Sequence, residues 1–156
     1  MVLDVTATGR LYRRTPPDGP RTMIDHHSAL IYVMVVASAA DDDMTDNELH
    51  IIGEIVSHLP VFKDFDTGRL PQITNECVEL LSDAEGLDRT FQIVRGALPE
   101  RLRETAYALA CDIVAADGSV SQEELRLLEM LRHAIGVGRL PAAAIERGAA
   151  ARYRTA

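Results

Sequence analysis

The amino-acid sequence predicts an all-α protein of about seven helices in a compact bundle. Hydrophobic residues make up 47% of the 156 positions, yet the chain has only four Tyr, three Phe and no Trp. A core of Leu, Ile, Val, Ala and Met suits close-packed helices better than β-sandwiches, which favour aromatic and β-branched residues. No segment shows the alternating pattern of a half-buried strand, and Pro, Gly and Asp separate successive helical stretches.

The N-terminal segment differs in composition from the rest of the chain. Residues 1–22 contain no apolar period, three prolines, and four arginines against two aspartates. We expect this tail to be disordered or loosely attached to one helical domain over residues 23–156. The whole chain has a net charge of −8, and the part after the tail, with twelve basic and twenty-two acidic residues, has −10.

Each expected helix has a start or stop signal. Thr22 or Asp25 is suited to cap the first helix, and its uncharged stretch 28–40 indicates a central core helix, because spanning a bilayer takes about 20 residues. Pro60 stops the second helix, and Pro99 ends the fourth and fits the first turn of the fifth. The expected helices run from the first cap to about residue 40, then over 46–58, 70–81, 87–98, 99–116, 122–135 and 141–152.

The most informative feature is an internal repeat at an offset of 76 residues. Residues 39–49, AADDDMTDNEL, align with residues 115–125, AADGSVSQEEL, and five of the eleven positions are identical. Each copy follows one apolar helix and opens a second. The repeat therefore predicts two pseudo-repeated helix–acidic turn–helix hairpins.

Helix capping explains much of this repeat. Thr45 with Glu48, and Ser121 with Glu124, have the spacing of capping boxes, in which each side chain pairs with the backbone of the other residue. Gly118 suits a left-handed residue at the end of the preceding helix. Apolar pairs around each cap have the spacing of a hydrophobic staple: Met44 with Leu49, and Val120 with Leu125. In one interpretation the acidic turns are therefore helix caps only.

A second interpretation is a metal site, because capping does not require all of these carboxylates. The first turn has three consecutive aspartates, which repel one another unless a cation is near. A complete EF-hand is excluded, since its first ligand positions are apolar here. If the hairpins pack about a pseudo-twofold axis, their oxygens suffice for one hard cation: Ca, Mg or Mn. The candidate ligands are Asp41, Asp43, Glu48, Asp117 and Glu124.

Other chemistry-bearing residues point to structural roles. His50, Glu54 and His58 share one face of the second helix, and their spacing favours a solvated or salt-bridged surface over a zinc site. Cys77 and Cys111 lack metal or redox spacings, so we expect two buried, reduced thiols.

The adjacent histidines 26 and 27 are interpreted as polar residues at a helix start. Asp112 lies on an otherwise apolar helix and needs a partner, for which Arg101, Arg103 or a bound cation are the candidates.

The stretch LPERLRETAYALACDIVAADGSVSQEE (98–124), continuing into LRLLEMLRHAIGV, resembles the TerB tellurite-resistance family of small all-helical domains. The resemblance covers roughly residues 25–150, and in the first half three aspartates (41–43) replace the Asp-Gly pattern. It implies a seven-helix bundle, a role in tellurite or general chemical stress, and no established enzymatic activity. It also implies a metal-linked function through acidic residues that correspond to Asp41, Glu48, Asp117 and Glu124.

The sequence thus predicts a non-enzymatic, cytoplasmic stress-response protein that binds a divalent cation through its acidic turns and acts on a protein partner. The negative charge disfavours nucleic acid and anionic membranes, and no signal peptide or membrane-spanning segment is visible. No nucleotide-binding, serine-hydrolase or zinc-protease motif occurs. The alternative is a helical interaction scaffold in which the turns are only caps; neither hypothesis sets an oligomeric state.

Overall fold

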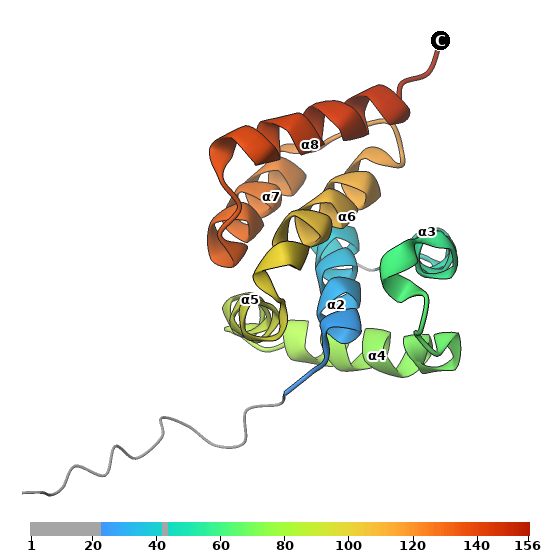
Figure 1. The fold of residues 1–156 in the computed structure, drawn as a ribbon, viewed down its shortest axis with the longest axis vertical. Helices are drawn as coiled ribbons and strands as arrows, with labels where there is room; N and C mark the ends of the chain where they lie inside the picture. Colours follow the sequence, from blue (N-terminus) through green and yellow to red (C-terminus); the bar gives the residue numbers. More distant parts are fainter. Residues whose placement is uncertain (1–22, 42–43) are drawn as a thin grey trace, which may run out of the picture.

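The computed structural model of the chain describes residues 23–41 and 44–156, without the side chain of Asp41. This described part contains seven α-helices, four short 3₁₀ helices and no β-strand, so the expected all-α bundle is confirmed (Figure 1). The tail predicted over residues 1–22 lies outside it. The α-helices are α2 (His26–Ser38), α3 (Asp46–His58), α4 (Leu70–Leu81), α5 (Gly86–Ala97), α6 (Arg103–Ala115), α7 (Gln122–Ile135) and α8 (Arg139–Arg152). The 3₁₀ helices are η1 (Ala39–Asp41), η2 (Pro60–Phe62), η3 (Thr67–Arg69) and η4 (Glu100–Leu102).

Helix α2 is the centre of the bundle, as its uncharged sequence predicts. All of its residues from Ser28 to Ser38 are buried. It packs against α6, α4 and α5, and more sparsely against α3 and α7 (Figure 1). Because each fully buried aliphatic side chain contributes about 1.5–3 kcal/mol, this helix supplies a large share of the hydrophobic stabilisation.

Helix α6 joins this core to the C-terminal helices. It packs against α2, α7 and α8, and its small residues Ala106 and Ala110 are fully buried. Small side chains let helix backbones approach closely, which suits a helix with neighbours on several sides. Helix α8 packs mainly on α6, through Ala142 and Ala149, and lies along one edge of the molecule, opposite α4 (Figure 1).

The helix ends follow the local signals with two differences. The expected helix over 99–116 is divided: Pro99 has an extended backbone with ψ of 147°, η4 follows, and α6 begins only at Arg103. A 3₁₀ turn is a common start for an α-helix, so Pro99 precedes the helical turns instead of lying within the first one. The last helix begins at Arg139, which places Pro141 within its first turn, where no amide donor is needed.

No helix in the described part of the chain has both the length and the apolar character needed to cross a membrane. The most apolar one, α2, has 13 residues.

Candidate functional site

Both predicted capping boxes are present. At the first turn, the Thr45 amide donates to Glu48 Oε2 at 2.6 Å, and the Glu48 amide donates to Thr45 Oγ1 at 3.3 Å. At the second, the Ser121 amide donates to Glu124 Oε2 at 2.7 Å, and the Glu124 amide donates to Ser121 Oγ at 3.1 Å. The reciprocal bonds satisfy amides at the start of α3 and α7 that have no partner within the helix.

The second turn also contains a local bend. Gly118 has a φ of +83°, in the left-handed region that its sequence predicted, and Asp117 Oδ1 accepts the Ser119 amide at 3.0 Å. Asp117 is exposed, so its carboxylate organises the turn from the solvent side. This contact uses one oxygen of the carboxylate.

The five predicted metal ligands have different outcomes. The side chain of Asp41 and the whole of Asp43 lie outside the described residues. Among the described residues, no three His, Cys, Asp or Glu side chains are placed to hold one ion, so Glu48, Asp117 and Glu124 do not form a site by themselves. The backbone of η1, which ends at Asp41, packs against α7, the helix that begins at the second turn. The pseudo-twofold relation between the hairpins stays a prediction.

Apolar side chains beside the two caps are only partly covered. The exposed fractions are 37% for Leu49, 46% for Val120 and 49% for Leu125. These values limit the apolar area that the predicted staples bury, and leave three apolar side chains near the acidic turns in contact with water.

The prediction for Asp112 was wrong about its partner. Asp112 pairs with Arg152 of α8, and not with Arg101 or Arg103. The hydrogen bond to Asp112 raises the pKa of the Arg152 guanidinium. This pair, which is partly exposed, connects α6 to α8 across 40 residues of sequence.

A second polar contact joins the same two helices. The Tyr107 hydroxyl of α6 donates to Glu146 Oε1 of α8 at 2.5 Å. Burial, together with this carboxylate, raises the pKa of Tyr107. The two expected buried thiols, Cys77 and Cys111, are confirmed, and burial raises the pKa of each to about 12. Thiols with such a pKa are protonated and weakly nucleophilic at neutral pH.

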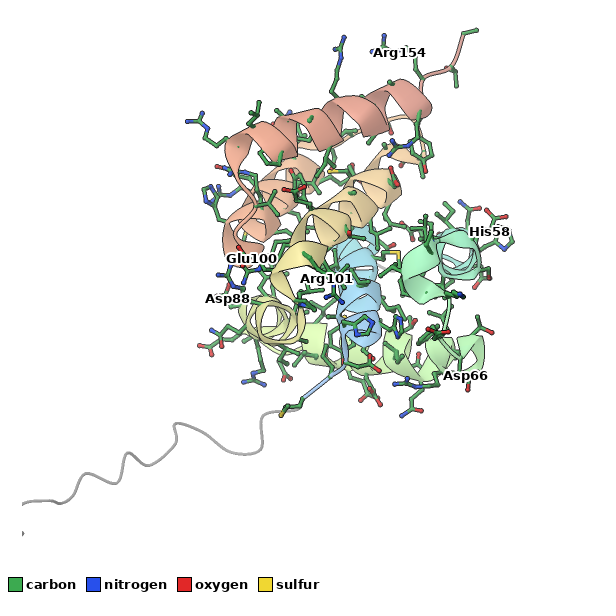
Figure 2. All side chains as sticks on the ribbon, viewed as in Figure 1. His58, Asp66, Asp88, Glu100, Arg101 and Arg154 are labelled. Atoms are coloured by element: carbon green, nitrogen blue, oxygen red, sulfur yellow. The ribbon has the colours of Figure 1, made fainter. Side chains whose placement is uncertain are left out.

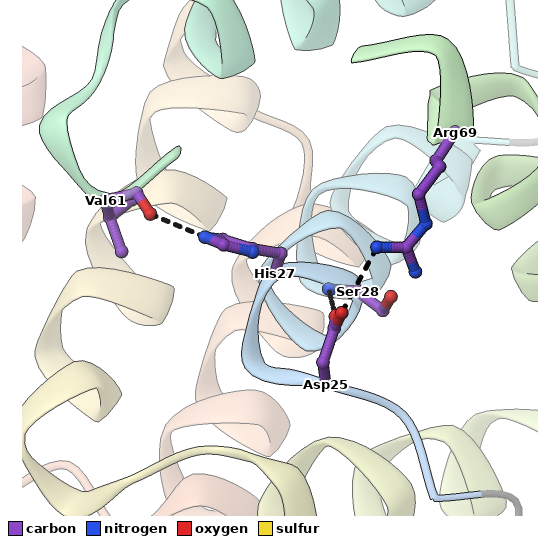
Figure 3. A network of polar contacts seen from close by, with 5 residues as sticks. All are labelled: Asp25, His27, Ser28, Val61 and Arg69. Carbon is purple, nitrogen blue, oxygen red and sulfur yellow. Dashed lines mark hydrogen bonds and ion pairs between the residues drawn. The ribbon is translucent and has the colours of Figure 1, made fainter. Parts of the chain in front are cut away.

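The start of α2 holds a network that the sequence did not predict. His27 was expected to be a polar residue at a helix start, but its ring contacts Phe62 and Phe65 at centroid distances of 5.7 and 5.4 Å. Its Nε2 lies 2.8 Å from the Val61 carbonyl oxygen (Figure 3). The pairing of two of the three phenylalanines at 62 and 65 was the only sequence signal for this cluster.

Asp25 completes the network beside His27. It caps α2 by accepting the Ser28 amide at 2.7 Å and pairs with the Arg69 guanidinium at 3.3 Å (Figure 3). Burial alone would raise the pKa of Asp25, but the hydrogen bonds from Ser28 and Arg69 outweigh it and hold that pKa below its usual value of 3.8. The network therefore fixes the start of α2.

The polar face of α3 is solvated, as predicted. His50 Nε2 lies 3.4 Å from Glu54 Oε1, and both side chains are largely exposed. His58 Nδ1 lies 2.7 Å from the Glu54 carbonyl oxygen, and the side chain of His58 lies at the outer edge of the molecule (Figure 2).

The fold and these contacts define a small all-helical protein whose most distinctive surface features are two capped acidic turns. A family model described as tellurite resistance protein TerB matches residues 27–147. The chain belongs to this TerB family, and the predicted resemblance is confirmed. The comparisons with curated proteins and with solved structures gave no match.

Proposed function

We propose that the chain is a non-enzymatic, cytoplasmic protein of tellurite or chemical stress resistance that works by binding. Family membership supports the stress role. The described groups with shifted pKa values support binding over catalysis, because burial and the contacts of helix ends and helix interfaces account for their shifts. Catalytic groups are usually tuned within a cleft, and nothing in these surroundings calls for such a role.

The first ligand we propose is a divalent cation, Ca, Mg or Mn, held between the acidic turns. The observation that carries this proposal is the packing of η1, which ends at Asp41, against α7, whose cap includes Glu124. Hard cations take oxygen ligands from carboxylates and backbone carbonyls. A cation at this place would relieve the repulsion among the consecutive aspartates 41–43 and use the second oxygen of Asp117.

Amide NMR on the full chain tests this proposal. Ca, Mg or Mn, added separately up to millimolar concentration, should shift or broaden the signals of residues 41–48 and 117–124. The double variant Asp41→Asn/Asp117→Asn should lose the response. Asp88→Asn, an exposed carboxylate in the first turn of α5 on another side of the molecule (Figure 2), should keep it. Unchanged spectra in all three metals would contradict the cation proposal.

The second candidate function is an interaction scaffold in which the turns only cap helices. The commitment of both Glu48 and Glu124 to reciprocal backbone bonds favours it, as do the exposed apolar side chains beside the caps. In this case the melting temperature of the wild-type chain would not respond to metal, and Asp41→Asn/Asp117→Asn would weaken partner binding. A metal-dependent rise in the wild-type melting temperature, lost in the double variant, favours the cation instead.

A further inference from the structure

The outer face of α8 has a different composition from the rest of the surface. The inner side of α8 packs on α6 through Ala142 and Ala149, while the opposite side is exposed along its whole length. We call the exposed side the α8 outer face. It comprises Arg139, Leu140, Ala143, Ala144, Arg147, Ala150, Ala151 and Arg154.

The shape of this face suits a second helix. Leu140 is 82% exposed, the second most exposed large apolar side chain among the described residues. Alanines follow it at spacings of three and four, so a partner backbone can come close without displacing bulky side chains. Between Arg147, Ala151 and Arg154 the surface forms a depression of about 200 Å³. Figure 2 shows Arg154 beyond the end of α8, at the outer edge of the molecule.

The charge of this face is opposite to that of the domain. Arg152 is held by Asp112, and Glu146, the only acidic residue between 139 and 154, accepts the Tyr107 hydroxyl. The remaining cations, Arg139, Arg147 and Arg154, make no ion pair within the part of the chain that the structure describes. A domain with a net charge of −10 thus presents one helix face with three arginines, and the exposed Glu146 lies at the border of this face beside Arg139.

We propose that the α8 outer face is the docking surface for an acidic amphipathic helix of another protein. Leu140 and the alanines would contact its apolar stripe. Arg147 on α8 and Arg154, just beyond the end of α8, would pair with its carboxylates. A second copy of this chain is disfavoured, because symmetric pairing of two such faces sets two arginine-bearing surfaces of like charge against each other. The proposal does not depend on the cation, and the family match ends at residue 147, so three of the eight residues of this face lie beyond it.

Fluorescence anisotropy of a labelled synthetic peptide tests the proposal with the full chain. The probe is a capped helical peptide of about 21 residues with a Leu/Ala stripe flanked by Glu residues. Saturable binding that weakens when salt rises from about 50 to 150 mM is expected. Arg147→Glu/Arg154→Glu should reduce affinity at least about tenfold, and the same peptide with Lys for Glu should then bind this variant better than the wild type.

Matched controls separate the alternatives. Arg101→Glu makes the same kind of charge change at an exposed position outside α8 (Figure 2) and should leave binding unchanged. Arg147→Gln/Arg154→Gln serves as the second variant if charge reversal lowers the melting temperature. The proposal is overturned if the peptide does not bind, if either double variant binds it like the wild type, or if anionic vesicles or duplex RNA bind this face more tightly than the peptide does.

Discussion

The two capped turns share their local chemistry but differ in how they join the fold. Glu48 is half-buried and lies in the first turn of α3, which buries only Ile52 and Val56. Glu124 is 7% exposed and lies in the first turn of α7, where four aliphatic side chains are buried as well. The same capping-box sequence therefore sets the helix start in both places, whereas tertiary packing decides how strongly the helix that follows is held.

The largest loss of stability should come from a change among the buried aliphatic side chains of α7. Leu131 is 1% exposed, so Leu131→Ala should lower the free energy of unfolding by about 3 kcal/mol. Leu125→Ala on the same helix removes a side chain that is 49% exposed and should cost less than about 0.5 kcal/mol. Urea denaturation measures both. Similar losses of unfolding free energy in the two variants would mean that α7 is not held through its buried side chains.

Removal of either cap should lower the stability by a smaller amount, and the loss should differ between the two caps. Ser121→Ala should cost about 1–2 kcal/mol, because it removes the hydroxyl that accepts the backbone amide of the buried residue Glu124. Thr45→Ala, at the more exposed turn, should cost about 0.5–1 kcal/mol. Thermal unfolding of the two variants side by side checks the order. A larger loss of stability in Thr45→Ala than in Ser121→Ala would contradict the expected order.

Replacement of two glycines by alanine, one in each hairpin, should change the stability in opposite directions. Gly118 has a φ of +83°, so Gly118→Ala should destabilise the chain by about 1 kcal/mol despite open space around it. Gly53 lies within α3 with no atom within 4 Å of an added Cβ, so Gly53→Ala should stabilise by about 0.5–1 kcal/mol. Shifts of the same sign in the melting temperatures would contradict this account of the turns.

The smallest expected effect concerns a cap outside the hairpins. The pKa of Asp25 is lowered in the folded protein, so its contribution to stability is present above its unfolded value of 3.8 and is lost as the pH falls through the lowered value. Asp25→Asn should remove this part of the acid destabilisation. Denaturation midpoints of wild type and variant between about pH 6 and 2 measure the difference; parallel curves would show that the Arg69 and Ser28 contacts do not act on Asp25.

Local signals predicted the helix ends well. The bounds of α3, α4 and α7 coincide with the expected ranges, because caps and prolines act within one turn of the chain. The capping boxes were predictable for the same reason. The cysteines were predictable as buried thiols because their spacing fits no metal or redox motif.

Contacts between distant segments were not predictable. Arg152 is the partner of Asp112 only because α8 packs on α6, and nothing near residue 112 indicates which arginine that packing brings close. His27 reaches the Val61 carbonyl because η2 returns to the start of α2. The α8 outer face depends in the same way on which side of α8 meets α6. The pattern of one sequence shows which residues share a face of a helix. It does not show which neighbouring helix that face contacts.

The cation site that we propose between the two acidic turns is tested most directly by a crystal of the full chain grown with Mn²⁺. We expect one anomalous-scattering peak between residues 41–43 and 117–124, with an Asp117 oxygen among its ligands. A structure from such a crystal with no peak between the turns, or with peaks only at other surface carboxylates, would contradict it.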